Sequence, residues 1–520
     1  MENTTMTSVQ PPTTATTTDR AAPESEAEDI TAPGYLDIPD KPRVLTRKRI
    51  GLVAGLLMAW VVYSIMPTDL DQAARVTAAV AILMALWWMT EAVPLAATAL
   101  IPLVAFPVLN VATIDDVGPS YGNPIIFLFM GGFLLALALQ RWNLHRRIAL
   151  LTVLLIGTRP RQIIGGFMIT TGFLSMWVSN TATAVMMLPI GISVLVLVAK
   201  SAPDGKPPTK FGIALMLGIA YSASIGSLGT IIGTPPNALL VGYMAETHGV
   251  TIGFGQWMLV GVPMAVVFMA ITWFLLTFVF FKPEITEIPG GRAMIQAEYK
   301  KLGRASSGEK LVLAIFILAA AAWISVPLVW PGSNIADAVI AMAVALVLFL
   351  VPANLRTGVP LLNWGSARAL PWDILILFGG GLALSAQFTA TGLSEWVGEE
   401  ITALSVLPLV LIIAAVAAIV LLLTELTSNT ATAAAFLPLI GGVAMGLGID
   451  PMLLVIPVAI AATCAFMLPV ATPPNAIAFS SGYINIADMI KAGIWLNLIA
   501  LVLITITTMT LAAWVFGLVY

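Results

Sequence analysis

The chain has 520 residues, of which 59% are hydrophobic and only 10% are charged. A soluble protein carries about 25% charged residues, so this composition predicts a membrane protein with room for about ten or more helices of roughly 20 residues each. The net charge of −3 argues against nucleic-acid binding, and one cysteine and two histidines leave little for disulfides, zinc sites or hydrolase chemistry.

The N-terminal segment, residues 1–44, is rich in Thr, Pro, Asp and Glu and has few large apolar side chains. Such a segment buries too little apolar surface to offset its loss of conformational entropy. It also lacks the apolar core of a signal peptide. We therefore predict a disordered tail in the cytoplasm.

Eleven apolar stretches follow, each long enough or almost long enough to cross a bilayer. They occupy residues 50–66, 76–92, 93–109, 123–140, 211–245, 257–281, 311–330, 335–352, 373–390, 452–485 and 493–517. Two more apolar stretches, 162–199 and 401–447, are interrupted near their midpoints by polar residues. The predicted fold is an all-α membrane protein with about 11 transmembrane helices and two re-entrant hairpins.

The basic residues orient these spans. If the N-terminus is cytoplasmic and both interrupted stretches return to the side from which they enter, every lysine and arginine except Arg75 lies on the cytoplasmic side. Cytoplasmic loops of multi-pass proteins carry an excess of these residues. The sequence therefore predicts a plasma-membrane protein with a cytoplasmic N-terminus, an external C-terminus, and hairpins that enter the lipid from opposite faces.

The two halves of the chain resemble each other. The matching segments are 127–140 with 376–388 and 177–190 with 426–440, both at an offset of 249, and 231–243 with 468–483 at an offset of 238. An odd number of predicted crossings separates the copies, which predicts an inverted repeat formed by residues 45–300 and 301–520. Inverted repeats with broken helices are typical of secondary transporters that bind their solute near the midplane.

Each hairpin carries the sequence SNTAT at its predicted tip, with the polar residues Ser179, Asn180 and Thr181 in the first and Ser428, Asn429 and Thr430 in the second. These residue types cap helix N-termini, and a helix N-terminus carries about half a positive charge. Two such tips that meet from opposite faces are suited to hold one anion between them.

The sequence TPPN interrupts two further apolar stretches, 211–245 and 452–485, which we predict to be broken helices. Consecutive prolines remove two backbone donors and force the preceding residue into an extended conformation. By extension of the ligand rules for other hard cations, sodium prefers carbonyl, hydroxyl and amide oxygens. The candidate ligands at the two breaks are the carbonyl groups of Gly233 and Ala471 and the side chains of Asn237 and Asn475.

Basic side chains are missing from the motif-bearing stretches. No lysine or arginine lies in residues 162–199, 211–281 or 369–490. The charge of a dianion bound there would have to be offset by helix N-termini, hydroxyl groups and co-bound sodium. Because an uncompensated charge in lipid is very costly, this arrangement predicts sodium coupling.

Glu91 and Glu425 are acidic residues within predicted spans and are candidates for proton coupling. Glu425 lies one turn before Asn429, but Met176 occupies the matching position in the first repeat. A proton-coupled carrier therefore stays open as an alternative.

The combination of two SNTAT tips and two TPPN segments resembles the divalent anion–sodium symporters, a family of sodium–dicarboxylate and sodium–sulfate cotransporters, over about residues 45–520. The resemblance implies a homodimer. Each protomer would comprise a scaffold domain and a transport domain that moves across the bilayer as an elevator. It implies no enzymatic activity and no cofactor, with sodium as the coupling ion.

In that family the substrate carboxylates contact the hairpin tips. The resemblance therefore implies substrate-binding roles for Ser179, Asn180, Thr181, Thr234, Ser428, Asn429, Thr430 and Pro473. It implies one sodium site at Ser175, Ser179, Asn180 and Gly233. It implies a second sodium site at Thr424, Thr427, Asn429 and Ala471, with Thr472 nearby.

The sequence thus predicts a sodium-coupled importer of C4 dicarboxylates such as succinate, malate or fumarate. The tips recognise the anionic group and say little about the rest of the solute, so a sulfate or citrate carrier is an alternative, as is a sodium-independent dicarboxylate exchanger. A membrane-embedded enzyme is disfavoured because the spans offer no nucleophile–base pair. A channel is disfavoured because a midplane site closed by two tips suits alternating access.

Overall fold

The computed structural model describes residues 42–157, 159–201, 209–285, 287, 291–330, 333–400 and 407–519. Chain contacts divide the protein into two units, Met1–Arg47 and Lys48–Tyr520. Most of the tail predicted at residues 1–44 lies outside the described residues. The described end of the first unit is helical from Pro42 onward, and the second unit holds all the motifs.

The described residues of the first part of the chain, up to residue 301, form helices. The helices are α2 (Pro42–Ile65), α3 (Gln72–Thr90), α4 (Leu95–Thr98), α5 (Ile101–Val108), α6 (Ile114–Val117), η2 (Gly118–Gly122), α7 (Pro124–Arg141), α8 (Leu144–Ile156), α9 (Pro160–Ser175), α10 (Asn180–Ser201), α11 (Thr209–Ser227), η3 (Ile231–Gly233), α12 (Pro235–His248), α13 (Phe254–Phe274), η4 (Leu275–Phe280) and α14 (Gly291–Lys301).

The remaining helices follow without a β-strand in the described residues, which hold only an isolated bridge between Pro352 and Pro360. They are α15 (Ser307–Val329), α16 (Asp337–Leu350), α17 (Trp364–Ala367), α18 (Trp372–Ala390), α19 (Leu393–Glu400), α20 (Leu409–Thr424), α21 (Asn429–Gly446), α22 (Met452–Thr463), α23 (Pro473–Ser480), α24 (Ile486–Thr507), η6 (Thr508–Ala512) and α25 (Ala513–Phe516).

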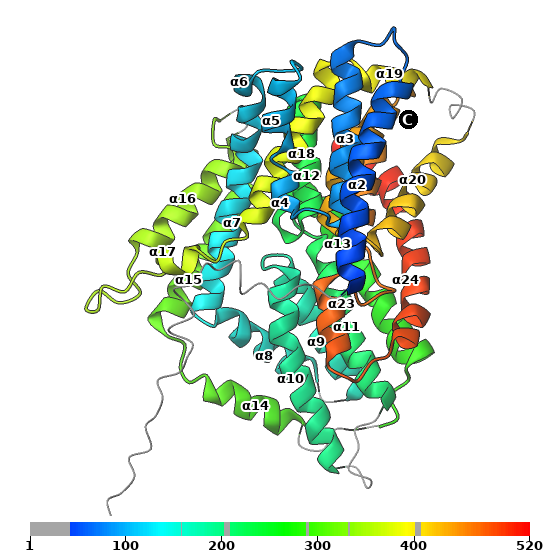
Figure 1. The fold of residues 1–520 in the computed structure, drawn as a ribbon. Helices are drawn as coiled ribbons and strands as arrows, with labels where there is room; N and C mark the ends of the chain where they lie inside the picture. The colour runs from blue at the N-terminus through cyan, green and yellow to red at the C-terminus, as the bar shows by residue number, and fades with distance from the viewer. Residues whose placement is uncertain are drawn as a thin grey trace, which may run out of the picture. The chain divides into compact units, whose positions relative to one another are not determined.

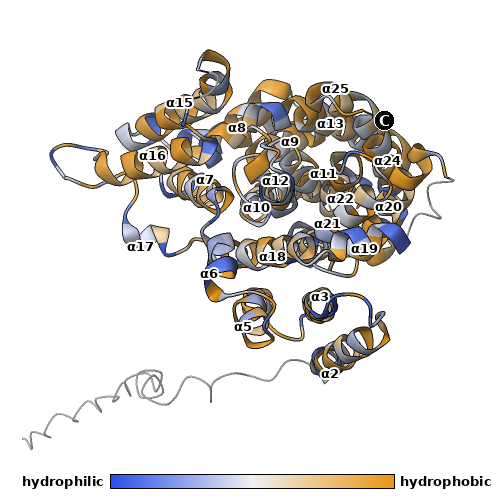
Figure 2. Cartoon of the chain, turned by 90° about the horizontal axis from the view of Figure 1, so that it is seen from above, coloured by the Kyte–Doolittle hydropathy of each residue, from blue (hydrophilic) through white to orange (hydrophobic). Residues whose placement is uncertain are grey.

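Ten helices in the described part of the chain are long and apolar enough to cross a bilayer. Large apolar side chains are exposed along α15, α16 and α24, three helices that are mostly coloured as hydrophobic in Figure 2. Exposed apolar surface on this scale suits contact with lipid rather than water. The all-helical membrane fold is therefore confirmed.

The stretch 93–109 differs from the single crossing predicted for it, because it forms the two short helices α4 and α5. Pro102 lies in the first turn of α5 and has no N–H to continue the preceding turn. The carbonyl oxygen of Ala99 between the two helices accepts a hydrogen bond of 2.5 Å from the Tyr121 hydroxyl. A backbone carbonyl group exposed by the break thus has a hydrogen-bond partner within the protein.

The four interrupted stretches each consist of two helices separated by non-helical residues, as predicted. The hairpins are α9 with α10 and α20 with α21, and the broken helices are α11 with α12 and α22 with α23. Residues 401–406 of the second hairpin lie outside the described residues. The re-entrant path of the hairpins through lipid stays a prediction.

The centre of the second unit is formed by the first halves of the broken helices. Every residue from Phe211 to Ser227 in α11 is buried, and so is every residue of α22. Helices α9, α10 and α23 pack around α11 (Figure 1), while α12, α20 and α21 pack around α22. Seen from above, α18 lies between α3 and α5 on one side and α12 and α21 on the other (Figure 2).

Helices α9 and α11 approach each other closely at two glycines. A Cβ atom built on Gly226 would lie 2.2 Å from the carbonyl oxygen of Gly172. Since this neighbour is backbone, it cannot move without shifting a whole helix. Gly226 is therefore a helix-packing residue rather than a ligand-binding one.

We expect Gly226→Ala to destabilise the protein by about 1–3 kcal/mol, the usual cost of overpacking a core. Thermal unfolding of detergent-solubilised protein measures this as a lower midpoint. Gly118→Ala is the matched control, because a Cβ atom at Gly118 would have no neighbour within 4 Å. Equal midpoints for the two variants would contradict this account of α9–α11 packing.

Candidate functional site

The first hairpin tip is tied to the first broken helix. Ser175 ends α9 and donates a hydrogen bond of 2.6 Å to the side-chain oxygen of Asn180, which begins α10. The amide nitrogen of Asn180 donates across 3.3 Å to the hydroxyl of Ser227, the last residue of α11. The structure therefore brings Ser175 and Asn180 together, as predicted, and joins them to the start of the first break.

The second tip repeats this contact 249 residues further on. Thr424 ends α20 and donates 2.8 Å to the side-chain oxygen of Asn429, which begins α21. The Thr424 hydroxyl also lies 2.6 Å from the carbonyl oxygen of Ala462 in α22. The hydroxyl oxygens of Thr427 and Thr432 lie 2.6 Å apart, and this hydrogen bond connects the tip to the first turn of α21.

In each break, an asparagine side chain binds backbone carbonyl groups of the same break, and the two asparagines occupy matching positions of the repeat. The amide nitrogen of Asn237 donates 2.9 Å to the carbonyl oxygen of Thr230, and that of Asn475 donates 3.1 Å to the carbonyl oxygens of both Ala465 and Leu468. In each asparagine the side-chain oxygen is buried and has no hydrogen-bond partner in the described structure. Each break thus presents one unused buried oxygen.

The residue before each proline pair is extended, as the sequence predicts. Thr234 has φ −147° and ψ 142°, and Thr472 has φ −142° and ψ 150°. The prolines themselves occupy the first turns of α12 and α23, where a missing N–H costs nothing. The breaks therefore lie just before the prolines, around Gly233 and Ala471.

A chain of polar contacts joins the two tips through the first break and the end of α22. The Asn237 side chain contacts the Ser227 carbonyl oxygen at 3.4 Å, and its backbone N–H donates 3.2 Å to the Thr234 carbonyl. The Thr234 hydroxyl lies 3.4 Å from the hydroxyl of Thr463, whose neighbour Ala462 accepts from Thr424. These contacts therefore connect the two tips, the first break and the end of α22.

Burial separates the tip residues from the break residues. Ser179, Thr181 and Pro473 are exposed, whereas Asn180, Ser428, Asn429 and Thr430 are half-buried. Gly233, Thr234, Ala471 and Thr472 are buried, as are Ser175 and Thr424. The tips are thus open to a solute, while the oxygens around the breaks lie in a drier environment that suits a bare cation.

Four helices begin at the site: α10 at Asn180, α12 at Pro235, α21 at Asn429 and α23 at Pro473. In α10 and α21 the first N–H groups have no partner within the helix and carry partial positive charge. Helices α12 and α23 each begin with two prolines, which have no N–H, so these two contribute mainly through the helix dipole. Together they provide the positive potential that an anion needs where the sequence supplies no lysine or arginine.

The two acidic residues singled out from the sequence have different surroundings. Glu91 is exposed and caps the C-terminus of α3 in a left-handed conformation, with φ 51°. Glu425 follows α20 directly, is 1% exposed and accepts hydrogen bonds from the second break. Only Glu425 belongs to the site.

Sequence reasoning missed Ser227 and Thr463. Ser227 corresponds to Ala465 in the second repeat, so a search for residues shared by both repeats passes over it. Its position among the spaced glycines Gly226, Gly229 and Gly233, close to TPPN, is the signal that was available. Thr463 ends α22, and only the packing of α22 against α12 brings it to Thr234.

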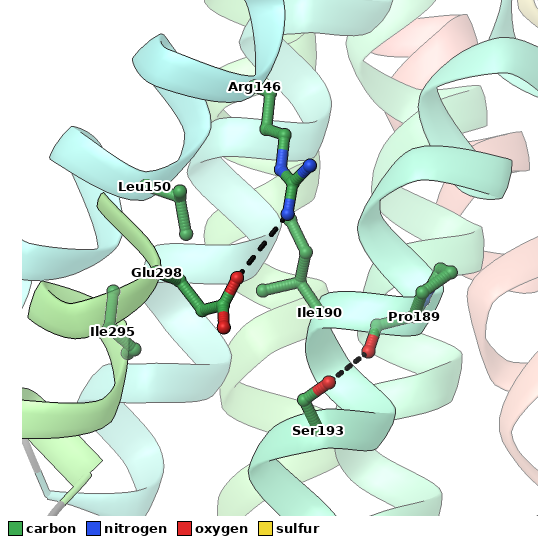
Figure 3. A pocket seen from close by; sticks show the side chains of 7 residues that line it. All are labelled: Arg146, Leu150, Pro189, Ile190, Ser193, Ile295 and Glu298. Carbon is green, nitrogen blue, oxygen red and sulfur yellow. Dashed lines mark hydrogen bonds and ion pairs between the residues drawn. The ribbon is translucent and has the colours of Figure 1, made fainter. Parts of the chain in front are cut away.

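A separate pocket lies between α8, α10 and α14 (Figure 3). Its polar lining is paired internally, because Arg146 contacts Glu298 at 3.4 Å and the Ser193 hydroxyl donates 2.8 Å to the Pro189 carbonyl. None of the predicted site residues lines it. Because its polar groups already bond to one another, the pocket offers few free groups to a solute, and we do not assign it to solute binding.

Comparison with known proteins places this geometry in context. The family model described as the sodium:sulfate symporter transmembrane region matches residues 46–518. The sodium-dependent dicarboxylate transporter SdcS of Staphylococcus aureus strain USA300 is 44% identical over 468 residues, which cover 88% of this chain and 89% of SdcS. SdcS of strain MRSA252 is 44% identical over 472 residues, covering 88% of this chain and 90% of that protein.

Two solved structures share the fold at low sequence identity. The YdaH transporter of Alcanivorax borkumensis has a TM-score of 0.55 at 14% identity, covering 92% of this chain and 99% of that one. MtrF of Neisseria gonorrhoeae has a TM-score of 0.53 at 13% identity, covering 93% of this chain and 96% of MtrF. At such identities the likeness concerns the fold alone.

Proposed function

The chain belongs to the sodium:sulfate symporter family, and on that premise we propose that it is a sodium-coupled secondary transporter that imports C4 dicarboxylates such as succinate, malate or fumarate across the plasma membrane. The observation that carries the proposal is the set of polar contacts that joins the two hairpin tips to the first break and to the end of α22, and through Glu425 to the second break, with no basic side chain among these residues. The 44% identity to a sodium-dependent dicarboxylate transporter supports the choice of solute.

Sodium occupies the two breaks in this proposal. The first ion would be held by Ser175, Ser179, Asn180 and Gly233. The second would be held by Thr424, Thr427, Asn429 and Ala471. The unpartnered side-chain oxygens of Asn237 and Asn475 support cation binding at these places, because a buried amide oxygen without a donor gains most from a hard cation.

The dicarboxylate binds at the tips in this proposal. Its carboxylates would contact Ser179, Asn180, Thr181, Ser428, Asn429 and Thr430, with Thr234 and Pro473 nearby. The exposure of Ser179 and Thr181 and the four helix N-termini support this assignment. Because Asn180 and Asn429 belong to both the anion and the cation assignments, binding of one ligand prepares the site for the other.

We further propose that the chain is an inverted repeat and that transport follows an elevator motion in a homodimer. The left-handed residues Asn143 and Gly392, which precede α8 and α19, stand 249 residues apart, and their φ angles are 54° and 73°. The moving group comprises α9–α13 and α20–α24, and the scaffold group comprises α2–α8 and α14–α19. The basic residues favour a cytoplasmic N-terminus and an external C-terminus.

Few polar contacts cross the boundary between these two groups in the described residues. The Asn123 side chain donates to Glu246 across 2.7 Å, and the hydroxyls of Thr247 and Ser385 lie 2.8 Å apart. These two contacts connect the end of α12 to α7 and α18. The backbone N–H of Phe254 at the start of α13 also donates across 2.7 Å to Asp337 at the start of α16. An elevator motion must break them, so they offer a direct test of the movement.

Radiolabelled succinate uptake into proteoliposomes tests the function. We expect an inward sodium gradient to drive accumulation, choline to abolish it, and unlabelled malate and fumarate to compete. Stronger competition by sulfate or citrate would identify one of the alternative solutes. Equal uptake in sodium and choline, with accelerated exchange against internal succinate, would contradict symport and favour an exchanger.

Asn180→Ala and Asn429→Ala test the site. Each removes an amide that serves both ligands, so we expect a loss of succinate uptake of at least about tenfold, the effect of 1.4 kcal/mol, together with weaker sodium dependence. Asn354→Ala, in an exposed turn far along the chain from either motif, is the control and should transport normally. Unchanged uptake in either site variant would refute the shared site.

The double variant Thr247→Cys with Ser385→Cys tests the movement. Oxidation should link the two positions, since their oxygens are 2.8 Å apart, and the cross-linked protein should lose transport until it is reduced. Each single variant under the same oxidant is the control, and the native Cys464 is buried. Full activity in the cross-linked protein would exclude motion between α12 and α18.

A further inference from the structure

The carboxylate of Glu425 is buried in a position with four N–H donors and no basic neighbour along its stretch of chain. It accepts hydrogen bonds from the backbone N–H groups of Phe466 (2.7 Å), Met467 (3.0 Å) and Leu468 (3.2 Å) and from the amide of Asn497 (2.8 Å). An ionised carboxylate only accepts hydrogen bonds, so it satisfies all four donors at once. These neutral dipoles compensate its charge in the absence of an ion pair.

The three backbone donors are consecutive and belong to the second break, between the end of α22 at Thr463 and the start of α23 at Pro473. In a trans peptide the N–H and C=O groups point in opposite directions. Peptides that aim their N–H groups at Glu425 therefore turn their carbonyl oxygens away from it. The Asn475 amide donates to the carbonyl oxygens of Ala465 and Leu468. Glu425 thus binds the N–H groups of the loop, and Asn475 binds its carbonyl groups.

The first break has no such carboxylate. Met176 occupies the position that matches Glu425, and it contributes its backbone carbonyl oxygen, to which the Thr230 hydroxyl donates. The indole N–H of Trp257 donates 3.0 Å to the carbonyl oxygen of Leu228 in the same break. The first break is thus held by neutral groups, whereas the second is held by a negative charge.

We propose that Glu425 is a positioning residue for the second cation site, and that it fixes the loop leading to Ala471 while its charge favours a cation at that break over the first. This inference rests on the proposed sodium coupling. Glu425 directly follows Thr424, whose hydroxyl joins the second tip to α22. In a medium of low polarity, a charge so close to the site attracts a cation strongly. The role differs from that of a proton carrier, because both carboxylate oxygens of Glu425 accept from N–H donors, three of them in the loop and one at Asn497 in α24.

The test is the sodium dependence of succinate uptake, measured as the sodium concentration for half-maximal rate, the maximal rate at saturating sodium, and the succinate KM at saturating sodium. We expect Glu425→Gln to raise the half-maximal sodium concentration at least tenfold and to flatten its concentration dependence, while saturating sodium restores most of the maximal rate and the KM. Glu425→Asp keeps the charge but has a shorter reach, so we expect an intermediate shift.

Two further variants keep the test decisive. Asn497→Ala removes one donor and leaves the backbone contacts in place, so we expect a two- to fivefold rise in the half-maximal sodium concentration even if Glu425→Gln fails to fold. Glu395→Gln, which neutralises an exposed acid on α19, is the charge-matched control and should leave the sodium dependence unchanged.

Several outcomes would overturn the inference. One is an unchanged sodium dependence in folded Glu425→Gln or in Asn497→Ala. Another is a raised succinate KM with unchanged sodium dependence, which would move Glu425 to the solute site. Loss of uptake at every sodium concentration in a normally folded Glu425→Gln would favour a proton carrier. If succinate uptake by the wild-type protein does not depend on the sodium concentration, the proposed function itself is refuted.

Discussion

The structure depends on satisfying backbone polar groups where helices are interrupted inside an apolar chain. In lipid no water replaces a lost hydrogen bond, so irregular backbone is tolerated only where the protein itself supplies partners. Asn237 and Asn475 do this by placing an amide across each break, and Glu425 does it with a carboxylate. The same interruptions that need these partners also create the carbonyl-rich surroundings suited to a cation.

This constraint gives a physical reason for coupling in the proposed transporter. The tips provide helix N-termini and hydroxyl groups but no basic side chain, so a dianion there is only partly compensated. In the proposed site, a cation at each break would supply the missing charge. Because Asn180 contacts both its own tip and Ser227 of the first break, the two ligands share a structural element rather than acting through a distant pathway.

The two halves of the chain are similar but not equivalent. Ser175 with Asn180 and Thr424 with Asn429 make the same contact. The surroundings differ, because Trp177 of the first tip packs against Phe254 and Phe316, whereas the matching Leu426 is 62% exposed. Together with Glu425, this asymmetry gives each break its own electrostatic environment and each tip its own packing.

The sequence by itself determined the helical membrane fold, the interruptions and the pairing of equivalent residues in the two tips, because these follow from composition, proline chemistry and repeated motifs. It could not predict that stretch 93–109 breaks into α4 and α5, since the partner that satisfies the break, Tyr121, lies well beyond it in the chain. Only the tertiary structure decided the roles of Ser227, Thr463 and Glu425. Their partners lie between 41 and 229 residues away, and a hydrogen bond over such a separation is set by how whole helices pack, which no local pattern encodes.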